Sequence, residues 1–338
     1  MNKENRSLLD IHNKIGRIHI KIDLPYLKKI LRKVSSSEIP HRNKNFIEKL
    51  GMTINPRTKS CPTMSGWTRG ARTIPLGKLI KISKIGNIQW KQIESKIISI
   101  NSGSRKEGAI KIKFPIKLNK KLGLLVGHIL GDGSIDYKYQ QVFYSNSNPE
   151  LLKEFESCML QLFNIRPRIW MQHTANFEGK TRWERRLNSI EELEKKKNVG
   201  LFYPSACGRI LNGLFDNFAI GINKEVSLRM MNLNSNFKRG LIRAFYDDEG
   251  SIMKNGKCIR LFQDRKDILE AFRIILKEFN IAPGEIKTYI KKDKKRHYFD
   301  IHRKSNFIRF KKEIGFTSSK KRNRLNKLCI IKNFKNSK

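Results

Sequence analysis

One nine-residue motif occurs twice in this sequence, first as Leu125-Val-Gly-His-Ile-Leu-Gly-Asp132-Gly133 and again as Ile242-Arg-Ala-Phe-Tyr-Asp-Asp-Glu249-Gly250. The two copies are offset by 117 residues, from 132 to 249, and the same offset relates residues on either side of the motif. Each copy ends in an acid followed by glycine. The repeat therefore predicts two copies of one structural module, each centred on one carboxylate.

Residues at four-residue spacing define one face of each motif helix: Gly123, Gly127 and Gly131 in the first copy, and Gly240, Ala244 and Asp248 in the second. A glycine costs a helix about 1 kcal/mol relative to alanine, so several on one face need a compensating contact. The close approach of another helix backbone provides one. We therefore expect the glycines and Ala244 to form the interface between the repeats, giving a monomer with an internal pseudo-dimer.

The two acids of the doubled motif are predicted to lie at the C-terminal ends of these adjacent helices. The helix dipole disfavours an acid there by about 0.3–1 kcal/mol, and two neighbouring acids repel each other. A divalent cation reverses both penalties, because carboxylates, free helix carbonyls and water are the ligands that Mg²⁺ prefers. We therefore predict a site for Mg²⁺ or another divalent cation. Its expected ligands are Asp132, Glu249, Gly131 and Asp248.

The charge of the chain points to a polyanionic partner. Lys+Arg 71 against Asp+Glu 30 gives a formal net charge of +41 over 338 residues. Such an excess favours nucleic acid, because each neutralised phosphate releases counterions. Biased codon usage could enrich lysine, but it would not by itself remove acids.

Cysteine usage and hydropathy indicate the cellular compartment of the protein. The five cysteines form no CxxC pair and are odd in number, which argues against a zinc ribbon and a disulfide framework. The N-terminus lacks the apolar core of a signal peptide, and no apolar run approaches the ~18 residues that span a bilayer. We expect a soluble, cytoplasmic, nucleoid-associated protein without a membrane partner.

The pattern changes from helix to strand after each acid. Alternating runs flank Asn255-Gly256, a strong hairpin signal, and residues 134–144 occupy the same place in the first copy. Helical periodicity follows at 149–163 and 267–279, and further strand-like segments come after each helix. Two such α+β units side by side would form a long concave basic surface. The side chains expected to contact DNA from these hairpins are Lys138, Lys254, Lys257 and Arg260.

The first hundred residues predict a small helical module. Helix-forming stretches cover 24–31, 45–51, 76–82 and 90–100. The segment Met64-Ser-Gly-Trp-Thr-Arg-Gly70, followed by Ile-Pro-Leu at 74–76, is similar to repressor-type helix-turn-helix domains, which lay a recognition helix in the major groove. This resemblance implies DNA contacts at Trp67, Arg69 and Arg72, with Trp67 also the core anchor. The alternative is a basic bundle that only supports the next domain.

From about residue 117 to 328 the chain resembles the LAGLIDADG homing endonucleases in their single-chain form with two motifs. The resemblance extends to Gly221-Ile-Asn-Lys224 and to residues 310–325. It implies two pseudo-symmetric αββαββα repeats that form a DNA-binding saddle, in which Asp132 and Glu249 hold divalent ions. It also implies Mg²⁺-dependent, site-specific cleavage of both strands of DNA. Family enzymes place basic residues near the scissile phosphate, and Lys224 and Lys320 are the candidates here.

The predicted fold is therefore α+β, with two LAGLIDADG repeats preceded by a small all-α, helix-turn-helix-like domain. The expected divisions are a helical domain at 1–104, a linker with a short strand at 105–116, repeat 1 at 117–235, repeat 2 at 236–330 and a basic tail at 331–338. Two other functions stay open. One is a transcriptional regulator that binds double-stranded DNA without cutting it, and the other is an intron RNA maturase, whose partner would be intron RNA.

Overall fold

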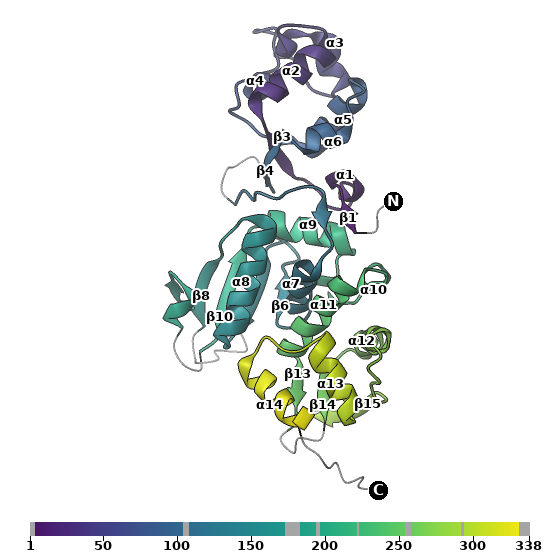
Figure 1. The fold of residues 1–338 in the computed structure, drawn as a ribbon. Coiled ribbons are helices and arrows are strands. Elements are labelled where there is room, and N and C mark those ends of the chain that lie inside the picture. Colours follow the sequence, from purple (N-terminus) through teal and green to yellow (C-terminus); the bar gives the residue numbers. More distant parts are fainter. Residues whose placement is uncertain are drawn as a thin grey trace.

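The computed structural model describes residues 4–103, 108–172, 183–193, 197–221, 223–253, 258–291 and 294–330. Three parts follow one another along the molecule in Figure 1: an N-terminal module at one end, the first repeat in the middle and the second repeat at the other end. Helices and sheets alternate in both repeats, as the predicted α+β fold class requires. The predicted DNA contacts Lys254 and Lys257, part of the linker and the tail 331–338 lie outside the described residues.

Repeat 1 surrounds a mixed sheet. Its main elements are α7 (Lys120–Leu130), β6 (Gly133–Ile135), β7 (Val142–Asn146), α8 (Pro149–Phe163), β8 (Arg168–Gln172), β9 (Trp183–Leu187), β10 (Val199–Tyr203), α9 (Ser205–Phe215), β11 (Ala219–Ile220), β12 (Asn223–Lys224) and α10 (Leu228–Met231). The strand order is β12-β11-β6-β7-β10-β8-β9. All neighbours are antiparallel except β11 and β6, which pair in parallel.

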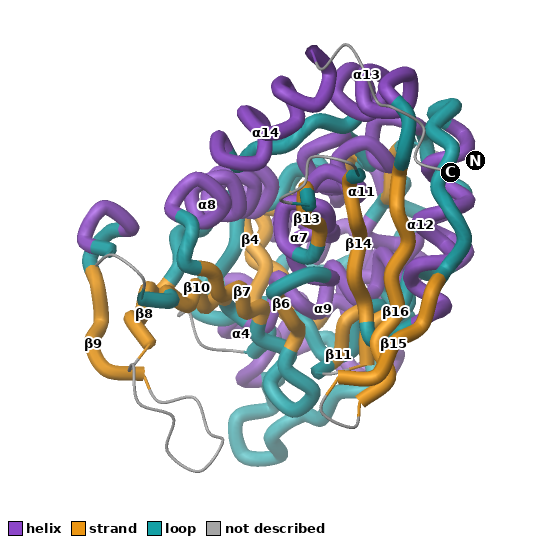
Figure 2. Tube along the Cα trace, turned by 90° about the horizontal axis from the view of Figure 1, so that it is seen from below, coloured by secondary structure: helices purple, strands orange, loops and turns teal. Residues whose placement is uncertain are grey.

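Repeat 2 follows the expected αββαββα order and adds one helix. Its elements are α11 (Ser235–Asp248), β13 (Gly250–Ile252), β14 (Ile259–Gln263), α12 (Lys266–Glu278), β15 (Lys287–Lys291), β16 (Lys294–Ile301), α13 (Lys304–Glu313) and α14 (Ser319–Ile330). The four strands are antiparallel in the order β13-β14-β16-β15. Figure 2 shows α8, α13 and α14 gathered on one side of the molecule, with the strands of both sheets on the other.

An inserted strand distinguishes the first repeat from the second. In the charged run that begins at Ser189, residues Ile190–Glu192 form a 3-10 turn with Ile190 buried. The residues before it form β9, which pairs with β8 at the edge of the sheet.

Helices α7 and α11 make the most extensive contact between any two described elements. A methyl group at Gly123 would collide with the carbonyl oxygen of Phe237, and one at Gly240 with that of Lys120. At Gly127 it would lie 2.8 Å from the Cβ of Ala244. The small residues of the doubled motif therefore let the two helix backbones touch.

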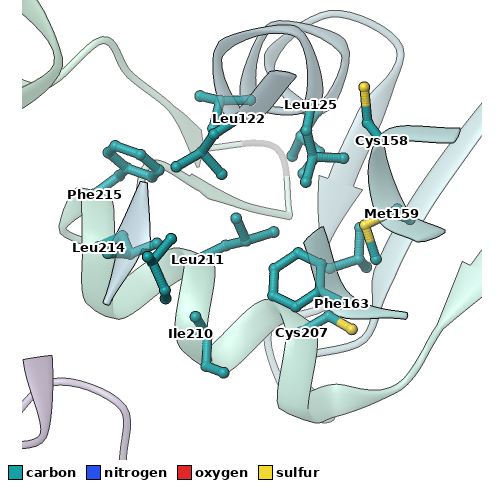
Figure 3. Close-up of a cluster of buried hydrophobic side chains, with 14 of the residues drawn as sticks. Leu122, Leu125, Cys158, Met159, Phe163, Cys207, Ile210, Leu211, Leu214 and Phe215 are labelled. Carbon is teal, nitrogen blue, oxygen red and sulfur yellow. The ribbon is translucent and has the colours of Figure 1, made fainter. Parts of the chain in front are cut away.

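The core of repeat 1 lies between three helices. Figure 3 shows Leu122 and Leu125 of α7 facing Met159 and Phe163 of α8, with the apolar side of α9 closing the cluster from below. The α9 residues in this cluster include Cys207, Ile210, Leu211, Leu214 and Phe215, and all of them are buried. Because α7 is held on this face by repeat 1 and on its glycine face by α11, it has little freedom to shift.

The N-terminal module combines helices with a sheet. Its elements are β1 (Asn5–Arg6), α1 (Leu8–Ile11), β2 (His19–Ile22), α2 (Leu24–Ser35), a 3-10 turn (Pro40–Arg42), α3 (Lys44–Lys49), α4 (Pro62–Thr68), β3 (Ile74–Pro75), α5 (Leu76–Ile85), α6 (Trp90–Glu94) and β4 (Ile97–Asn101). Three strands form a sheet in the order β3-β2-β4, and β1 pairs with β5 (Ile116–Lys117) beside repeat 1.

The prediction of an all-α first domain was therefore wrong. The segment 90–100, expected to be one helix, is α6 followed by β4, whose register pairs Ile100 with Ile20 of β2. Isoleucine-rich stretches suit either a buried helix or a strand, and here the β-branched residues pair across a sheet.

Replacing Gly240 with alanine should lower the free energy of unfolding by about 2–3 kcal/mol, because the methyl would collide with α7, 2.7 Å from the amide nitrogen of Leu124. Gly77→Ala in α5 is the matched control, since a Cβ there meets no described atom within 4 Å. The control should be neutral or stabilise by up to about 1 kcal/mol. Urea denaturation measures both variants, and equal effects would contradict the close packing of α7 and α11.

Candidate active site

Two acids meet where the motif helices end. Asp132 directly follows Gly131, the C-cap residue of α7, and Glu249 is the C-cap residue of α11. Each acid is followed by the strand that opens its repeat's sheet, β6 or β13. The shared helix interface thus delivers one carboxylate from each repeat to the same place.

The acids are held in surroundings that disfavour their charge. The protein around Asp132 removes much of its hydration, and the neighbouring Asp248 and Glu249 add negative charge, so the pKa of Asp132 rises to about 7. Loss of hydration also raises the pKa of Glu249, with Lys224 acting in the opposite direction. A divalent cation bound between these two carboxylates would stabilise their ionised forms.

A lysine from each repeat reaches the end of a motif helix. Lys224 of β12 donates a hydrogen bond to the carbonyl oxygen of Gly131. Lys321 of α14 donates to the carbonyl oxygens of Tyr246 (3.1 Å), Asp247 (2.5 Å) and Gly250 (2.7 Å). Burial lowers the pKa of both lysines, while the surrounding acids oppose that shift. The two ammonium groups therefore sit beside the carboxylates at related places.

Lys320, predicted as the second basic residue, does not occupy this place. It lies exposed on α14, and its neighbour Lys321 points to the end of α11 instead. One residue along a helix turns the side chain by roughly 100°, so two adjacent lysines point in different directions. The sequence contains both, and only the helix orientation distinguishes them.

A buried carboxylate fixes the start of α14. Asp247 accepts hydrogen bonds from the backbone amides of Thr317 (2.7 Å) and Ser318 (3.1 Å). Burial raises the pKa of Asp247 to about 6, and the two amide donors oppose the rise. These bonds tie the end of α11 to the helix that carries Lys321. Asp247 belongs to the motif, but no sequence pattern indicates this role.

Asp248 was predicted to be a metal ligand, but its carboxylate turns into the first repeat. Its Oδ2 atom lies 3.0 Å from Nδ1 of His128, and the Tyr144 hydroxyl donates to Oδ1 at 2.9 Å. Burial disfavours a charged His128 ring, but the carboxylates of Asp248 and Glu154 outweigh it and raise the pKa of His128 to about 10. Asp248 can therefore offer an ion its main-chain carbonyl, as Gly131 can.

The structure separates the described members of the predicted DNA contacts into three groups. Arg69, Arg72 and Lys138 are exposed. Arg260 forms an ion pair with Asp300 at 2.7 Å and lies over the Tyr298 ring. Trp67 is 1% exposed, so its prediction as a DNA contact was wrong and it belongs to the core of the N-terminal module.

The open face of the first sheet carries polar and aromatic side chains that sequence reasoning missed. A hollow of about 540 Å³ lies over β6, β7 and β10. Its lining includes Ser134, Gln141, Phe143, Ser145, Gln172 and Phe202. The aromatic pair, Phe143 and Phe202, has ring centroids 4.9 Å apart. The alternation of side chains along each strand was the available signal, but it does not say which face stays open.

No group of three or more histidine, cysteine, aspartate or glutamate side chains is placed to hold a metal ion in the described part of the chain. Within the same residues, none of the helices has the length and apolar character needed to cross a membrane. A metal at the two acids would therefore need oxygen ligands from the backbone, water or a bound phosphate.

The doubled region matches a known family. Residues 119–198 and 236–315 each match the model of the LAGLIDADG-like domain. The chain therefore contains two LAGLIDADG-like domains. Both matched ranges contain one motif acid, so the family's repeat coincides with the repeat seen in the sequence and the structure.

Three curated proteins of Methanocaldococcus jannaschii are similar to parts of this chain. Identity is 33% over 113 residues to DNA-directed RNA polymerase subunit Rpo1C, covering 33% of this chain and 12% of that protein. Replication factor C small subunit is 26% identical over 255 residues, which cover 74% of this chain and 12% of that protein. Glutamine–fructose-6-phosphate aminotransferase (isomerizing) is 23% identical over 288 residues, which cover 82% of this chain and 23% of that protein. The chain thus spans only about an eighth to a quarter of each relative.

Solved structures of two homing endonucleases and of another LAGLIDADG domain are also similar. I-DmoI in complex with DNA and Ca is 15% identical, with a TM-score of 0.40, covering 58% of this chain and 90% of that one. I-WcaI bound to its DNA recognition sequence is 16% identical, with a TM-score of 0.40, and the match covers 59% of this chain and 81% of that one. The N-terminal LAGLIDADG domain of DUF199/WhiA is 14% identical with a TM-score of 0.37, covering 64% and 90%.

The raised pKa of Asp132 predicts how the metal-free protein responds to pH. The folded state holds the proton to about pH 7, whereas the unfolded chain loses it near 3.8, so Asp132 should make stability fall as pH rises between these values. At pH 8 Asp132→Asn should therefore stabilise the metal-free protein by about 1 kcal/mol, a value reduced because solvent reaches the carboxylate. Mg²⁺ should stabilise the wild type more at pH 8 than at pH 5.

Thermal denaturation with and without Mg²⁺ measures these effects. Glu38→Gln removes one carboxylate from an 82% exposed side chain in the N-terminal module and serves as the control. The control should keep the Mg²⁺ response of the wild type. If Asp132→Asn gains as much from Mg²⁺ as the wild type does, the two-acid site is not where the ion binds.

Proposed function

We propose that this chain is a site-specific endonuclease that hydrolyses both strands of a DNA duplex with the help of divalent cations. The observation that carries the proposal is the meeting of Asp132 and Glu249 at the ends of two packed helices, with a partly buried lysine beside each. One acid and one lysine per repeat suits one cut per strand. The two LAGLIDADG-like domains support the same activity.

The residues at the helix ends fit a hard divalent cation. Asp132 and Glu249 would hold it, with the main-chain carbonyls of Gly131 and Asp248 as further oxygen donors. Because the protein raises the pKa of both acids, the site favours a positive charge more than a solvated surface pair would. When bound, such an ion lowers the pKa of water and stabilises the leaving oxygen of a phosphodiester. Mg²⁺ is the proposed cofactor.

Lys224 and Lys321 are the proposed basic residues of the reaction. Burial lowers the pKa of each, which brings the ammonium group closer to the range in which it can exchange a proton near neutral pH. Their hydrogen bonds to helix-end carbonyls hold them beside the acids without neutralising them. The geometry therefore favours Lys321 over the exposed Lys320 for the second half-site.

DNA is proposed to lie along the strand side of the two sheets. The polar and aromatic hollow over β6, β7 and β10 would face base edges, and basic side chains at its margins would contact phosphates. A second hollow of about 360 Å³ lies where residues 14–16 meet repeat 1, and it is lined by Lys14, Lys138 and Arg209. Figure 2 places α4 on this same strand side, so the N-terminal module would extend the contact along the duplex.

The curated relatives support a module that is separate from their named activities. A polymerase subunit, a replication factor and an aminotransferase share no reaction, and this chain spans at most 23% of any of them. The match that covers 82% of the chain cannot be confined to residues 117–338, so it reaches into the N-terminal module. We infer that the module and the repeats form one functional unit.

Cleavage of a genomic fragment library tests the proposal. With Mg²⁺, the full chain should produce discrete double-strand breaks, and Asp132→Asn combined with Glu249→Gln should lower the rate by at least about a hundredfold while keeping DNA binding. The paired control is Glu38→Gln with Glu285→Gln, which removes two acids away from the helix ends. Specific binding without cleavage by the wild type would instead support the regulator.

The two adjacent lysines provide a sharper comparison. Lys321→Met should slow cleavage by about 10²-fold or more, because it removes the ammonium group that contacts the end of α11. Lys320→Met removes the same charge one residue away on the exposed side of α14, so it should change the rate less than about threefold. Single-turnover kinetics at saturating enzyme separate the chemical step from DNA affinity. Equal effects of the two variants would show that Lys321 contributes only general positive charge.

A further inference from the structure

The two acids of the doubled motif have different surroundings, although the repeats are related by one offset. The residues around Asp132 include His128, Tyr144 and Glu154 of repeat 1 and Asp248 of repeat 2. The residues 117 positions away are Phe245, Leu261, Ala271 and, for Asp248, Gly131. Every polar member of the first set has an apolar or small counterpart in the second.

A chain of hydrogen bonds leads from the buried histidine to the carboxylate of Asp132. Asp248 bridges His128 and Tyr144, at 3.0 Å and 2.9 Å. The side-chain amide of Asn146 lies 3.3 Å from the Tyr144 oxygen and donates to Oδ2 of Asp132 at 2.8 Å. The backbone amide of Asp132 also lies 3.4 Å from Oδ2 of Asp248. Asp132 is thus held through both its side chain and its backbone.

The other end of this chain is anchored across the repeats. Nε2 of His128 lies 3.1 Å from Oε2 of Glu154, and the Thr317 hydroxyl donates to Oε1 of Glu154 at 2.8 Å. The side chains of His128 and Asp248 have no exposed surface. A buried polar network is costly unless each member has its partner, and a satisfied one specifies a single arrangement. This network therefore restricts how repeat 1 and repeat 2 can sit around Asp132.

Glu249 has no such support. Its side chain accepts no hydrogen bond from any described residue, although Lys224 lies near enough to affect its pKa. Gln263, at the position related to Asn146, accepts instead from the backbone amide of Asp264 at 2.7 Å. Phe245, at the position related to His128, stacks on Phe272 with ring centroids 4.4 Å apart. The second acid is thus surrounded by apolar packing where the first has a polar network.

We propose that Tyr144 and Asn146, held by Asp248 and His128, are positioning residues that orient Asp132 alone and make the two half-sites of the enzyme inequivalent. The inference rests on the proposed function and deepens it. Asp132 is held in one orientation before DNA or metal arrives, whereas Glu249 is oriented only by what it binds. Weakening the network should affect the ion and the strand that depend on Asp132 and leave the other pair largely unchanged.

Mn²⁺ titration followed by electron paramagnetic resonance tests the proposal without relying on cleavage. The full chain is titrated with Mn²⁺ in the presence of a random-sequence duplex. Tyr144→Phe and Asn146→Ala should each weaken one class of Mn²⁺ sites by about tenfold, as loss of a group that orients a metal ligand does. Tyr246→Phe deletes the same atom from a fully buried tyrosine whose hydroxyl has no partner among the described residues, so it should match the wild type.

Strand-specific cleavage of a site recovered from the fragment library provides the second readout. Tyr144→Phe should slow one strand about tenfold more than the other, so that nicked duplex accumulates, while Tyr246→Phe should cut both strands as the wild type does. Equal slowing of both strands, unchanged Mn²⁺ affinity in Tyr144→Phe, or a wild type that binds no Mn²⁺ would each overturn the proposal. A wild type that binds Mn²⁺ but cuts nothing would overturn the proposed nuclease, and the Mn²⁺ comparison would still decide the positioning role.

Discussion

The contact between the glycine-bearing faces of α7 and α11 is the constraint on which the rest of the structure depends. Gly123 and Gly240 lie against the backbone of the opposite helix, where any side chain would collide. Backbones that touch along their length bring their C-terminal ends together, and each motif ends in an acid. The same residues that join the repeats therefore create the candidate active site, so the doubled motif serves packing and chemistry at once.

This geometry concentrates negative charge at the ends of two packed helices. The helix ends contribute main-chain carbonyl oxygens, and Asp132 and Glu249 contribute carboxylates whose pKa values are raised. Lys224 and Lys321 compensate in part by donating hydrogen bonds to those carbonyls. The negative charge that remains favours a divalent cation. A bound phosphate would provide the oxygen ligands that the cation still lacks. Such unfavourable local electrostatics are common at functional sites.

Much of the doubled part could be predicted from the sequence. Four-residue spacing of small residues, an acid before glycine and strand-like runs after it recur at one offset, and they indicated the helix pair, the position of the acids and the α+β class. The features that escaped prediction depend on three-dimensional orientation. Lys320 and Lys321 are the same residue type, and only the orientation of α14 determines which of the two side chains reaches the end of α11. Asp248 looked like a ligand until its side chain was seen to face His128 and Tyr144.

The N-terminal module was harder to read from sequence because its signals are short and ambiguous. Isoleucine-rich segments around Ile20 and Ile100 suit helix or strand, and they pair as strands. Trp67 was correctly expected in the core, but burial excludes it from the DNA contacts that its neighbour Arg69 can still make. In the doubled region, a pattern that occurs in both copies supports the prediction for each of them. The first hundred residues contain no repeat that allows such a comparison.

Iron-directed backbone cleavage tests most directly whether the two helix ends form the metal site. Fe²⁺ replaces Mg²⁺ at sites built from oxygen ligands and, with ascorbate, generates radicals that cut the polypeptide next to the bound ion. Mass spectrometry of the full chain with duplex DNA should find cuts near residues 131–133 and 248–250, and excess Mg²⁺ should suppress both. Cuts at other places only, or cuts that Mg²⁺ leaves unchanged, would contradict a metal site at the ends of α7 and α11.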